Sequence, residues 1–199
     1  MTMTETKAGI TGVLLAGGQG RRMGGVDKGL QLLRGKPMAQ HVIERFAPQV
    51  DELLINANQN IEKYQSLGYR VIPDAIGGFA GPLAGLHRGL SEAAHPLVVT
   101  APCDSPFLPL DLVVKLRAAL EQHNAELAVA TTGGQLHPVF SLCRTPVLPG
   151  LNAFLDSGGR KIDRWFSQLK VVAVRFEDEA AFRNINTRED LAASGMGGN

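Results

Sequence analysis

The sequence predicts an α/β fold, a three-layer sandwich built on a mostly parallel, Rossmann-like sheet. Short apolar runs alternate along the chain with segments in which apolar residues recur every three or four positions, which is typical of strands joined by helices. The chain has 199 residues, of which 44% are hydrophobic and 20% charged, so it can bury one sizeable core. We therefore expect a single domain over residues 1–199, with disordered ends at about 1–7 and 194–199.

The predicted strands are apolar runs bounded by turn-forming residues. They are, in chain order, Gly12–Ala16, Glu52–Asn56, Arg70–Pro73, Leu97–Ala101, Ala125–Thr131, Val139–Leu142 and Val171–Arg175. Ligands of such sheets bind beyond the carboxyl ends of the strands, so the functional residues are expected at that edge.

The predicted helices are segments whose apolar residues fall on one helix face. They are expected at Met38–Phe46, Pro82–Ala93, Leu110–His123 and Arg160–Gln168. In Leu110–His123, leucines at positions 112, 116 and 120 lie four apart, and Pro109 stands at the start. Near the end of the chain, Thr187 followed by Glu189 predicts the N-cap of one more helix.

The stretch after the first predicted strand has the composition of an anion-binding loop. Five glycines lie between positions 17 and 25, and Arg21, Arg22 and Lys28 add positive charge. Backbone N–H groups and cations at the end of a first strand are what a nucleoside triphosphate needs. The dinucleotide and P-loop motifs are both excluded, because Met23 stands where the last glycine is needed and Lys28 is followed by Gly29. A solvated surface loop is the alternative.

Three polar residues follow the next three predicted strands. Asp104 lies between two prolines, where its carboxylate could hold Mg²⁺ or could only form an Asx turn. Asp74 could accept hydrogen bonds from the N1–H and amino group of guanine, or could be a turn residue. Asn56 could serve the same base or end its strand, and Asn58 could share that task.

Charge and cysteine content narrow the class of protein. A net charge of +1 excludes a strongly basic nucleic-acid binder. Cys103 and Cys143 do not form a C-x-x-C pair, so neither a zinc site nor a disulfide framework is indicated. Residues 1–7 contain no apolar segment, and no run approaches roughly 18 apolar residues. We expect a cytoplasmic protein that does not bind a membrane.

The stretch 14–28, LLAGGQGRRMGGVDK, resembles the signature loop of nucleotidyltransferases, and its RRMG…VDK form resembles the molybdenum cofactor guanylyltransferases. The likeness continues in order over nearly the whole chain. It includes Asn56-Ala57-Asn58, Asp74, Gly81-Pro82-Leu83-Ala84-Gly85, Pro102-Cys103-Asp104-Ser105-Pro106, His137-Pro138 and Asn184-Ile185-Asn186-Thr187.

This resemblance implies a sheet of the nucleotide-diphospho-sugar transferase type and transfer of GMP from GTP to the terminal phosphate of molybdopterin, with Mg²⁺. The implied catalytic residues are Lys28, Arg22 and Asp104, with Asp104 as the metal ligand. The implied GTP-binding residues are Leu15, Ala16, Gly17, Gly18, Lys28, Asn56, Asp74 and Asp104. The acceptor is expected at His137, Arg160, Asn184 and Asn186.

Other functions remain open at this point. A CTP-dependent molybdopterin cytidylyltransferase or a sugar-phosphate nucleotidyltransferase would share the fold. A non-catalytic GTP-binding module that delivers cofactor would need the guanine contacts but not Asp104 with a metal. The expected partners are GTP, molybdopterin and, transiently, cofactor-biosynthesis proteins or recipient apoenzymes, with the chain itself a monomer.

Overall fold

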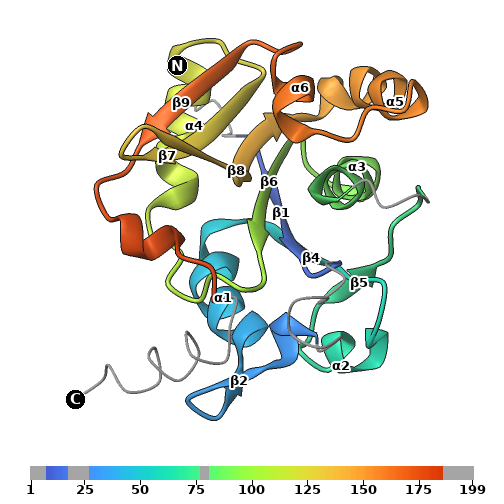
Figure 1. Ribbon diagram of the computed structural model, residues 1–199, viewed down its shortest axis with the longest axis vertical. Coiled ribbons are helices and arrows are strands. Elements are labelled where there is room, and N and C mark those ends of the chain that lie inside the picture. The colour runs from blue at the N-terminus through green and yellow to red at the C-terminus, as the bar shows by residue number, and fades with distance from the viewer. Residues whose placement is uncertain (1–7, 18–26, 77–80, 186–199) are drawn as a thin grey trace, which may run out of the picture.

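A seven-stranded sheet forms the centre of the computed structural model, which describes residues 8–17, 27–76 and 81–185 (Figure 1). The strand order is β5-β4-β1-β6-β8-β7-β9, and every neighbouring pair is parallel except those of β8, which runs antiparallel to β6 and β7. The strands are β1 (Ile10–Leu15), β4 (Glu52–Asn56), β5 (Arg70–Ile72), β6 (Leu97–Pro102), β7 (Leu127–Thr132), β8 (Gln135–Arg144) and β9 (Val171–Arg175). The predicted mostly parallel sheet is confirmed.

The position of β1 decides where a ligand can bind. The chain proceeds from β1 to β4 and β5 on one side of β1, and returns to form β6 on the other side. Such a reversal of strand order opens a crevice at the carboxyl ends of the strands. The ends of β1, β4 and β6 therefore frame the candidate site.

Six α-helices lie within the described residues. They are α1 (Met38–Phe46), α2 (Ile61–Gln65), α3 (Pro82–Glu92), α4 (Leu112–Gln122), α5 (Leu148–Asp156) and α6 (Ile162–Phe166). A short hairpin, β2 (Leu32–Leu33) with β3 (Lys36–Pro37), precedes α1. In the same described part of the chain, four 3-10 turns cover Lys28–Leu30, Ala47–Gln49, Thr145–Val147 and Glu179–Phe182.

The two faces of the sheet bury different side chains, as strand alternation requires. Leu14 and Val99 pack in one cluster with residues of α1 and α4, whereas Val13 and Val98 pack in another with residues of α3, α5 and α6. Figure 1 shows α3, α5 and α6 on one side of the sheet and α1 and α4 on the other. The predicted three layers are confirmed.

Several predicted bounds were wrong for local reasons. Helix α4 begins at Leu112 rather than Leu110, with Asp111 at its N-cap. The predicted helix Arg160–Gln168 is helical only over Ile162–Phe166. Strand β8 starts four residues before the predicted Val139, because Pro138 does not end the strand. The register with β7 shifts beside Pro138, and a proline, which has no N–H, is tolerated at such an irregularity.

Two helices were not predicted at all. Helix α2 has five residues, too few for an apolar period to be visible. Helix α5 contains Pro149 and Gly150, which indicate a turn, although proline is well tolerated in the first turn of a helix. No helix in the described part of the chain is long and apolar enough to cross a membrane.

Candidate nucleotide-binding and active site

The residues at the end of β1 form hydrogen bonds with the ends of the two neighbouring strands, β4 and β6. The Ala16 backbone N–H donates to the Asn56 carbonyl at 2.8 Å, and the Leu15 carbonyl accepts from the Cys103 N–H at 3.0 Å. Gly17 follows, and a Cβ added to it would lie 3.1 Å from Asn58 Nδ2. The first predicted GTP-binding residues, Leu15, Ala16 and Gly17, thus lie at the carboxyl edge of the sheet, where the strand order switches.

Asn56, Asn58 and Asp74 form one hydrogen-bonded network at the ends of β4 and β5. The Asp74 carboxylate accepts from Asn56 Nδ2 at 2.8 Å and from Asn58 Nδ2 at 2.7 Å, one on each oxygen. Asn56 is buried, with 3% of its surface exposed, and also donates to the Ile72 carbonyl. An ionised carboxylate can accept about four hydrogen bonds, so Asp74 keeps acceptor capacity for a ligand.

Helix α3 packs closely against this network. A Cβ on Gly85 would lie 2.5 Å from Asn56 Oδ1 and 2.5 Å from Leu15 Cδ2. Only glycine lets the helix approach at this distance, because real Cβ atoms are not found so close to other heavy atoms. Gly85 therefore fixes how α3 supports Asn56.

On the other side of β1, Lys28 and Asp104 form an ion pair. Lys28 Nζ lies 3.2 Å from Asp104 Oδ2, and the two side chains are 24% and 12% exposed. Asp104 comes from the turn after β6, and Lys28 opens the 3-10 turn Lys28–Leu30. Within the described residues, no backbone N–H donates to the Asp104 carboxylate, so the Asx turn considered from the sequence is not formed there.

Beside this pair, Asp27 is held by α2. Its carboxylate accepts from the Tyr64 hydroxyl at 2.6 Å and from Asn60 Nδ2 at 3.0 Å. Cys103, next to Asp104, is buried, and burial together with the neighbouring Asp104 charge raises the pKa of its thiol. Cys103 therefore remains a neutral packing group.

One predicted acceptor residue, Asn184, lies beside the turn that carries Asp104, and a second, His137, contacts Phe182 in the segment that leads to Asn184. Asn184 Oδ1 accepts from the Ser105 hydroxyl at 2.5 Å, and the neighbouring Ile185 N–H donates to the Asp104 carbonyl at 2.8 Å. His137 stacks on Phe182, with ring centroids 4.8 Å apart. Partial burial lowers the pKa of His137, which favours the neutral ring.

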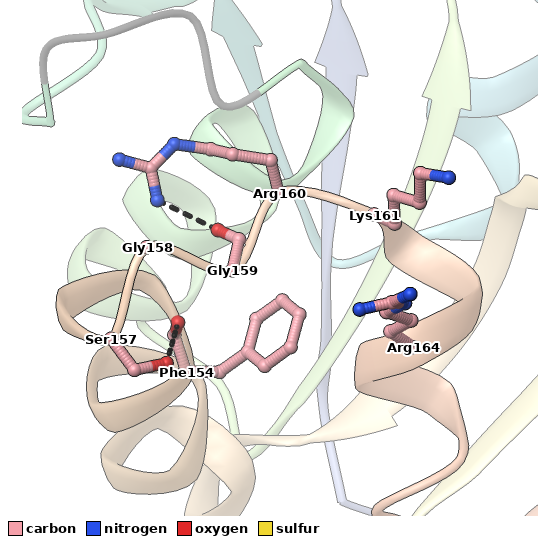
Figure 2. A pocket seen from close by; sticks show the side chains of 7 residues that line it. All are labelled: Phe154, Ser157, Gly158, Gly159, Arg160, Lys161 and Arg164. Atoms are coloured by element: carbon pink, nitrogen blue, oxygen red, sulfur yellow. Dashed lines mark hydrogen bonds between the residues drawn. The ribbon is translucent and has the colours of Figure 1, made fainter.

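Arg160 lies apart from these two. It comes after α5, on the sheet face covered by α3, α5 and α6, beside a hollow of about 420 Å³. Figure 2 shows the Phe154 ring pointing into this hollow while the Arg160 guanidinium points away from the ring. That guanidinium donates to the carbonyls of Leu155 and Gly159, at 2.8 and 2.7 Å.

Some predicted residues cannot be placed. Arg22, Gly18 and Asn186 lie outside the described residues, as does the helix N-cap predicted at Thr187. Sequence reasoning missed the contacts of Asn60 and Tyr64 with Asp27; their spacing of four residues, one helical turn, was the available signal. In the described part of the chain, no three His, Cys, Asp or Glu side chains form a group that could hold a metal ion.

Comparison with known proteins identifies the family. The family model described as MobA-like NTP transferase domain matches residues 12–172. A molybdenum cofactor guanylyltransferase of Cupriavidus taiwanensis is 51% identical over 189 residues, covering 92% of this chain and 95% of that protein. The chain belongs to the molybdenum cofactor guanylyltransferase family. A guanylyltransferase of Bordetella petrii is also 51% identical, over 93% of this chain and 96% of its own length.

Solved structures agree with this membership. Molybdopterin-guanine dinucleotide biosynthesis protein A of Archaeoglobus fulgidus is 25% identical, with a TM-score of 0.76 over 94% of this chain and 96% of that chain. A 4-diphosphocytidyl-2C-methyl-D-erythritol synthase of Anaerococcus prevotii shares the fold, with a TM-score of 0.75, 15% identity and 94% coverage of each chain. The molybdenum cofactor guanylyltransferase family consists of nucleotidyltransferases, so this chain is a nucleotidyltransferase enzyme.

Proposed function

We infer that this protein transfers GMP from GTP to the terminal phosphate of molybdopterin, giving molybdopterin guanine dinucleotide and pyrophosphate. The observation that carries this inference is the pair of polar clusters on either side of β1, in a chain that belongs to the guanylyltransferase family. One cluster, around Asp74, suits a purine base. The other, Lys28 with Asp104, suits a metal-bound triphosphate. Leu15, Ala16 and Gly17 would lie between them, against the nucleotide.

The Asp74 network is suited to guanine. The two asparagine amides hold the carboxylate in one orientation, and its remaining lone pairs can accept from the N1–H and amino group of the base. A cytosine offers no such pair of donors, so its binding would leave the Asp74 carboxylate incompletely satisfied. Buried polar groups left without partners penalise the wrong ligand strongly.

The residues present fit a magnesium ion bound together with the nucleotide. Mg²⁺ is usually held by one or two carboxylates plus substrate phosphates, so the single carboxylate of Asp104 suffices. Lys28 Nζ forms an ion pair with one oxygen of that carboxylate, Asp104 Oδ2, at 3.2 Å. When bound, the ion would neutralise phosphate charge and stabilise the leaving pyrophosphate.

The transfer is an in-line displacement at the α-phosphorus of GTP. An oxygen of the acceptor phosphate forms the new P–O bond, and the bond to the β-phosphate oxygen breaks as pyrophosphate leaves. No general base is needed, because the acceptor phosphate is already ionised. The protein mainly positions reactants and neutralises charge. Lys28 and Arg22 would stabilise the developing negative charge, while the backbone N–H groups at Gly17 and Gly18 would hold the phosphates.

The acceptor would approach from the side of Asn184 and His137. Asn184 lies beside the turn that carries Asp104, through its bond to Ser105. Asn186, two residues further on, and Arg160 complete the proposed acceptor residues. Arg160 would have to turn its guanidinium from its present carbonyl partners toward the acceptor phosphate.

We further propose that the chain acts in the cytoplasm as a single-domain monomer that meets cofactor-biosynthesis proteins or recipient apoenzymes only transiently. The alternatives, CTP-dependent or sugar-phosphate transfer and a non-catalytic delivery module, are less well supported, because the relatives at about 51% identity are guanylyltransferases.

The test is a pyrophosphate-release assay with purified protein, GTP, Mg²⁺ and molybdopterin. We expect pyrophosphate and the guanine dinucleotide in equal amounts, little product with CTP, and none when acceptor or Mg²⁺ is omitted. Tight GTP binding without pyrophosphate release would instead support the delivery module. A preference for CTP would contradict the assignment of Asp74 to guanine.

A further inference from the structure

The buried hydroxyl of Tyr64 lies against the segment that carries Lys28. Tyr64 lies on α2, is 0% exposed, and donates to Asp27 Oδ1 at 2.6 Å. Asn60 holds the other oxygen of the same carboxylate at 3.0 Å. Burial, the nearby Cys103 and the bond to Asp27 raise the pKa of Tyr64, so its hydroxyl stays protonated and remains a donor. A short O–H···O⁻ bond of this kind is among the stronger hydrogen bonds in proteins.

The same small cluster lies next to both partners of the ion pair along the chain. A Cβ on Gly29 would collide with the Tyr64 hydroxyl and lie 3.0 Å from Cys103 Sγ, so the backbone after Lys28 packs directly on these two side chains. Lys28 lies between Asp27 and Gly29, and Asp104 follows Cys103. The cluster therefore fixes the backbone on both sides of Lys28 and immediately before Asp104.

We propose that Tyr64 is a positioning residue for nucleotidyl transfer: its hydroxyl holds Asp27 and thereby keeps Lys28 directed at Asp104. This inference rests on the proposed function. Tyr64 itself does not touch the reacting atoms, and its effect passes through Asp27. Displacement of a charged group by about 1 Å can cost roughly 100-fold in rate, so loss of one buried hydroxyl is expected to be visible in turnover.

The test is a double-mutant cycle on Tyr64→Phe and Asp27→Ala, with kcat, KM for GTP and the melting temperature measured for each variant. We expect each single change to lower kcat by about 10-fold to 100-fold, and the double variant to lose no more than Asp27→Ala alone. Asp27→Asn keeps an acceptor for the Tyr64 hydroxyl and should retain kcat within a few-fold of wild type. Tyr69→Phe, a change at a partly buried tyrosine of the same core, is the matched control and should leave kcat unchanged.

A second measurement does not depend on the reaction. Hydrogen exchange of the Leu30 and Gln31 amides, which bond to the Asp27 and Lys28 carbonyls, should be at least 10-fold faster in Tyr64→Phe. A lower melting temperature with unchanged kcat would show a purely structural role and overturn the inference, as would additive losses of kcat in the double variant. A wild type that makes no guanine dinucleotide would refute the proposed function instead. In that case the exchange rates decide on their own whether Tyr64 holds the Lys28 segment, and unchanged rates would overturn the inference.

Discussion

Asn58 and Asp74 bind each other twice. The Asn58 amide donates to Asp74 Oδ2 at 2.7 Å, and the Asp74 backbone N–H donates back to Asn58 Oδ1 at 2.8 Å. This reciprocal pair fixes both the backbone and the carboxylate of Asp74 without using all of its acceptor sites. Asn58 therefore determines how Asp74 would present its oxygens to the proposed guanine base.

Replacing Asp74 with alanine should remove the acceptor for guanine. We expect weaker binding of GTP and little change for CTP, so that both become poor substrates with similar kcat/KM. Asn58→Ala should shift the GTP-to-CTP ratio in the same direction but less, because Asn56 still holds the carboxylate. Asn152→Ala, at an exposed position of α5, serves as control. An unchanged ratio in Asp74→Ala would remove this residue from base recognition.

Lys28→Ala should lower turnover by roughly 10²-fold to 10³-fold, the usual loss when one preorganised charge donor is removed from a transfer site. Steady-state pyrophosphate release measures the effect. Lys36→Ala is the matched control, because that ammonium binds Glu44 at 2.8 Å on the exposed surface. Near wild-type turnover in Lys28→Ala would identify an ordinary surface charge.

Asp104→Asn should separate the metal role from folding. Asparagine keeps the size of the side chain but removes the charge that Mg²⁺ needs. We expect a nearly unchanged melting temperature, a steep fall in guanylyl transfer and only partial recovery at high Mg²⁺. The rate is measured across a Mg²⁺ titration, with a thermal melt as the folding control. A stable variant with an unshifted Mg²⁺ curve would contradict the metal assignment.

Two glycines of α3 offer a paired experiment. A Cβ at Gly85 would press on Asn56 and Leu15, whereas one at Gly89 would press on Val13 at the same 2.5 Å. Both Gly→Ala variants should be destabilised by about 1–3 kcal/mol, the usual cost of overpacking. Only Gly85→Ala should also weaken GTP binding, as measured by titration calorimetry. Equal losses of affinity in the two variants would show that Gly85 has no specific link to the nucleotide site.

The pH dependence of stability should carry a contribution from His137. Partial burial lowers the pKa of the folded-state ring below the ordinary value of 6.5, while Glu179 opposes the shift. The contribution is therefore complete above the unfolded pKa and is lost as the pH falls below that value and through the lower folded-state pKa. We expect the melting temperature of wild type to drop more than that of His137→Gln between pH 7.5 and 5.5. Parallel curves would show that His137 does not titrate differently on folding.

The residues at strand ends were predictable, because strand periodicity and the rule of carboxyl-edge sites need no tertiary information. Asn56, Asp74 and Asp104 each follow a clear apolar run, and the sheet brings all three to one edge. Their partners were not predictable. The reciprocal bonds between Asn58 and Asp74, and the single bond from the Tyr64 hydroxyl to Asp27, depend on the conformation of short segments whose sequences show no period.

The positions of the acceptor residues were only partly predictable, because the sequence did not reveal the path of the chain after β8. With α5 unrecognised, Arg160 was expected near the other acceptor residues. Instead, α5 and α6 lie with α3 on one face of the sheet, and Arg160 lies between α5 and α6 in the chain. His137 contacts Phe182 on the opposite face. The packing of whole elements decides which face of the sheet a connecting helix covers. A single local stretch of sequence does not contain this information.

The bond between Ile185 and the backbone of Asp104 has a consequence for the nascent chain. The Ser105 hydroxyl bonds to Asn184, which lies 79 positions later in the chain. The turn that carries the Asp104 carboxylate is therefore completed late in translation. A polypeptide that has emerged only as far as α6 can already contain the glycine-rich segment and much of the sheet, yet it still lacks these supports. Premature termination before residue 184 would therefore leave this turn without both supports, and any activity that depends on Asp104 would begin only after the final segment has left the ribosome and docked.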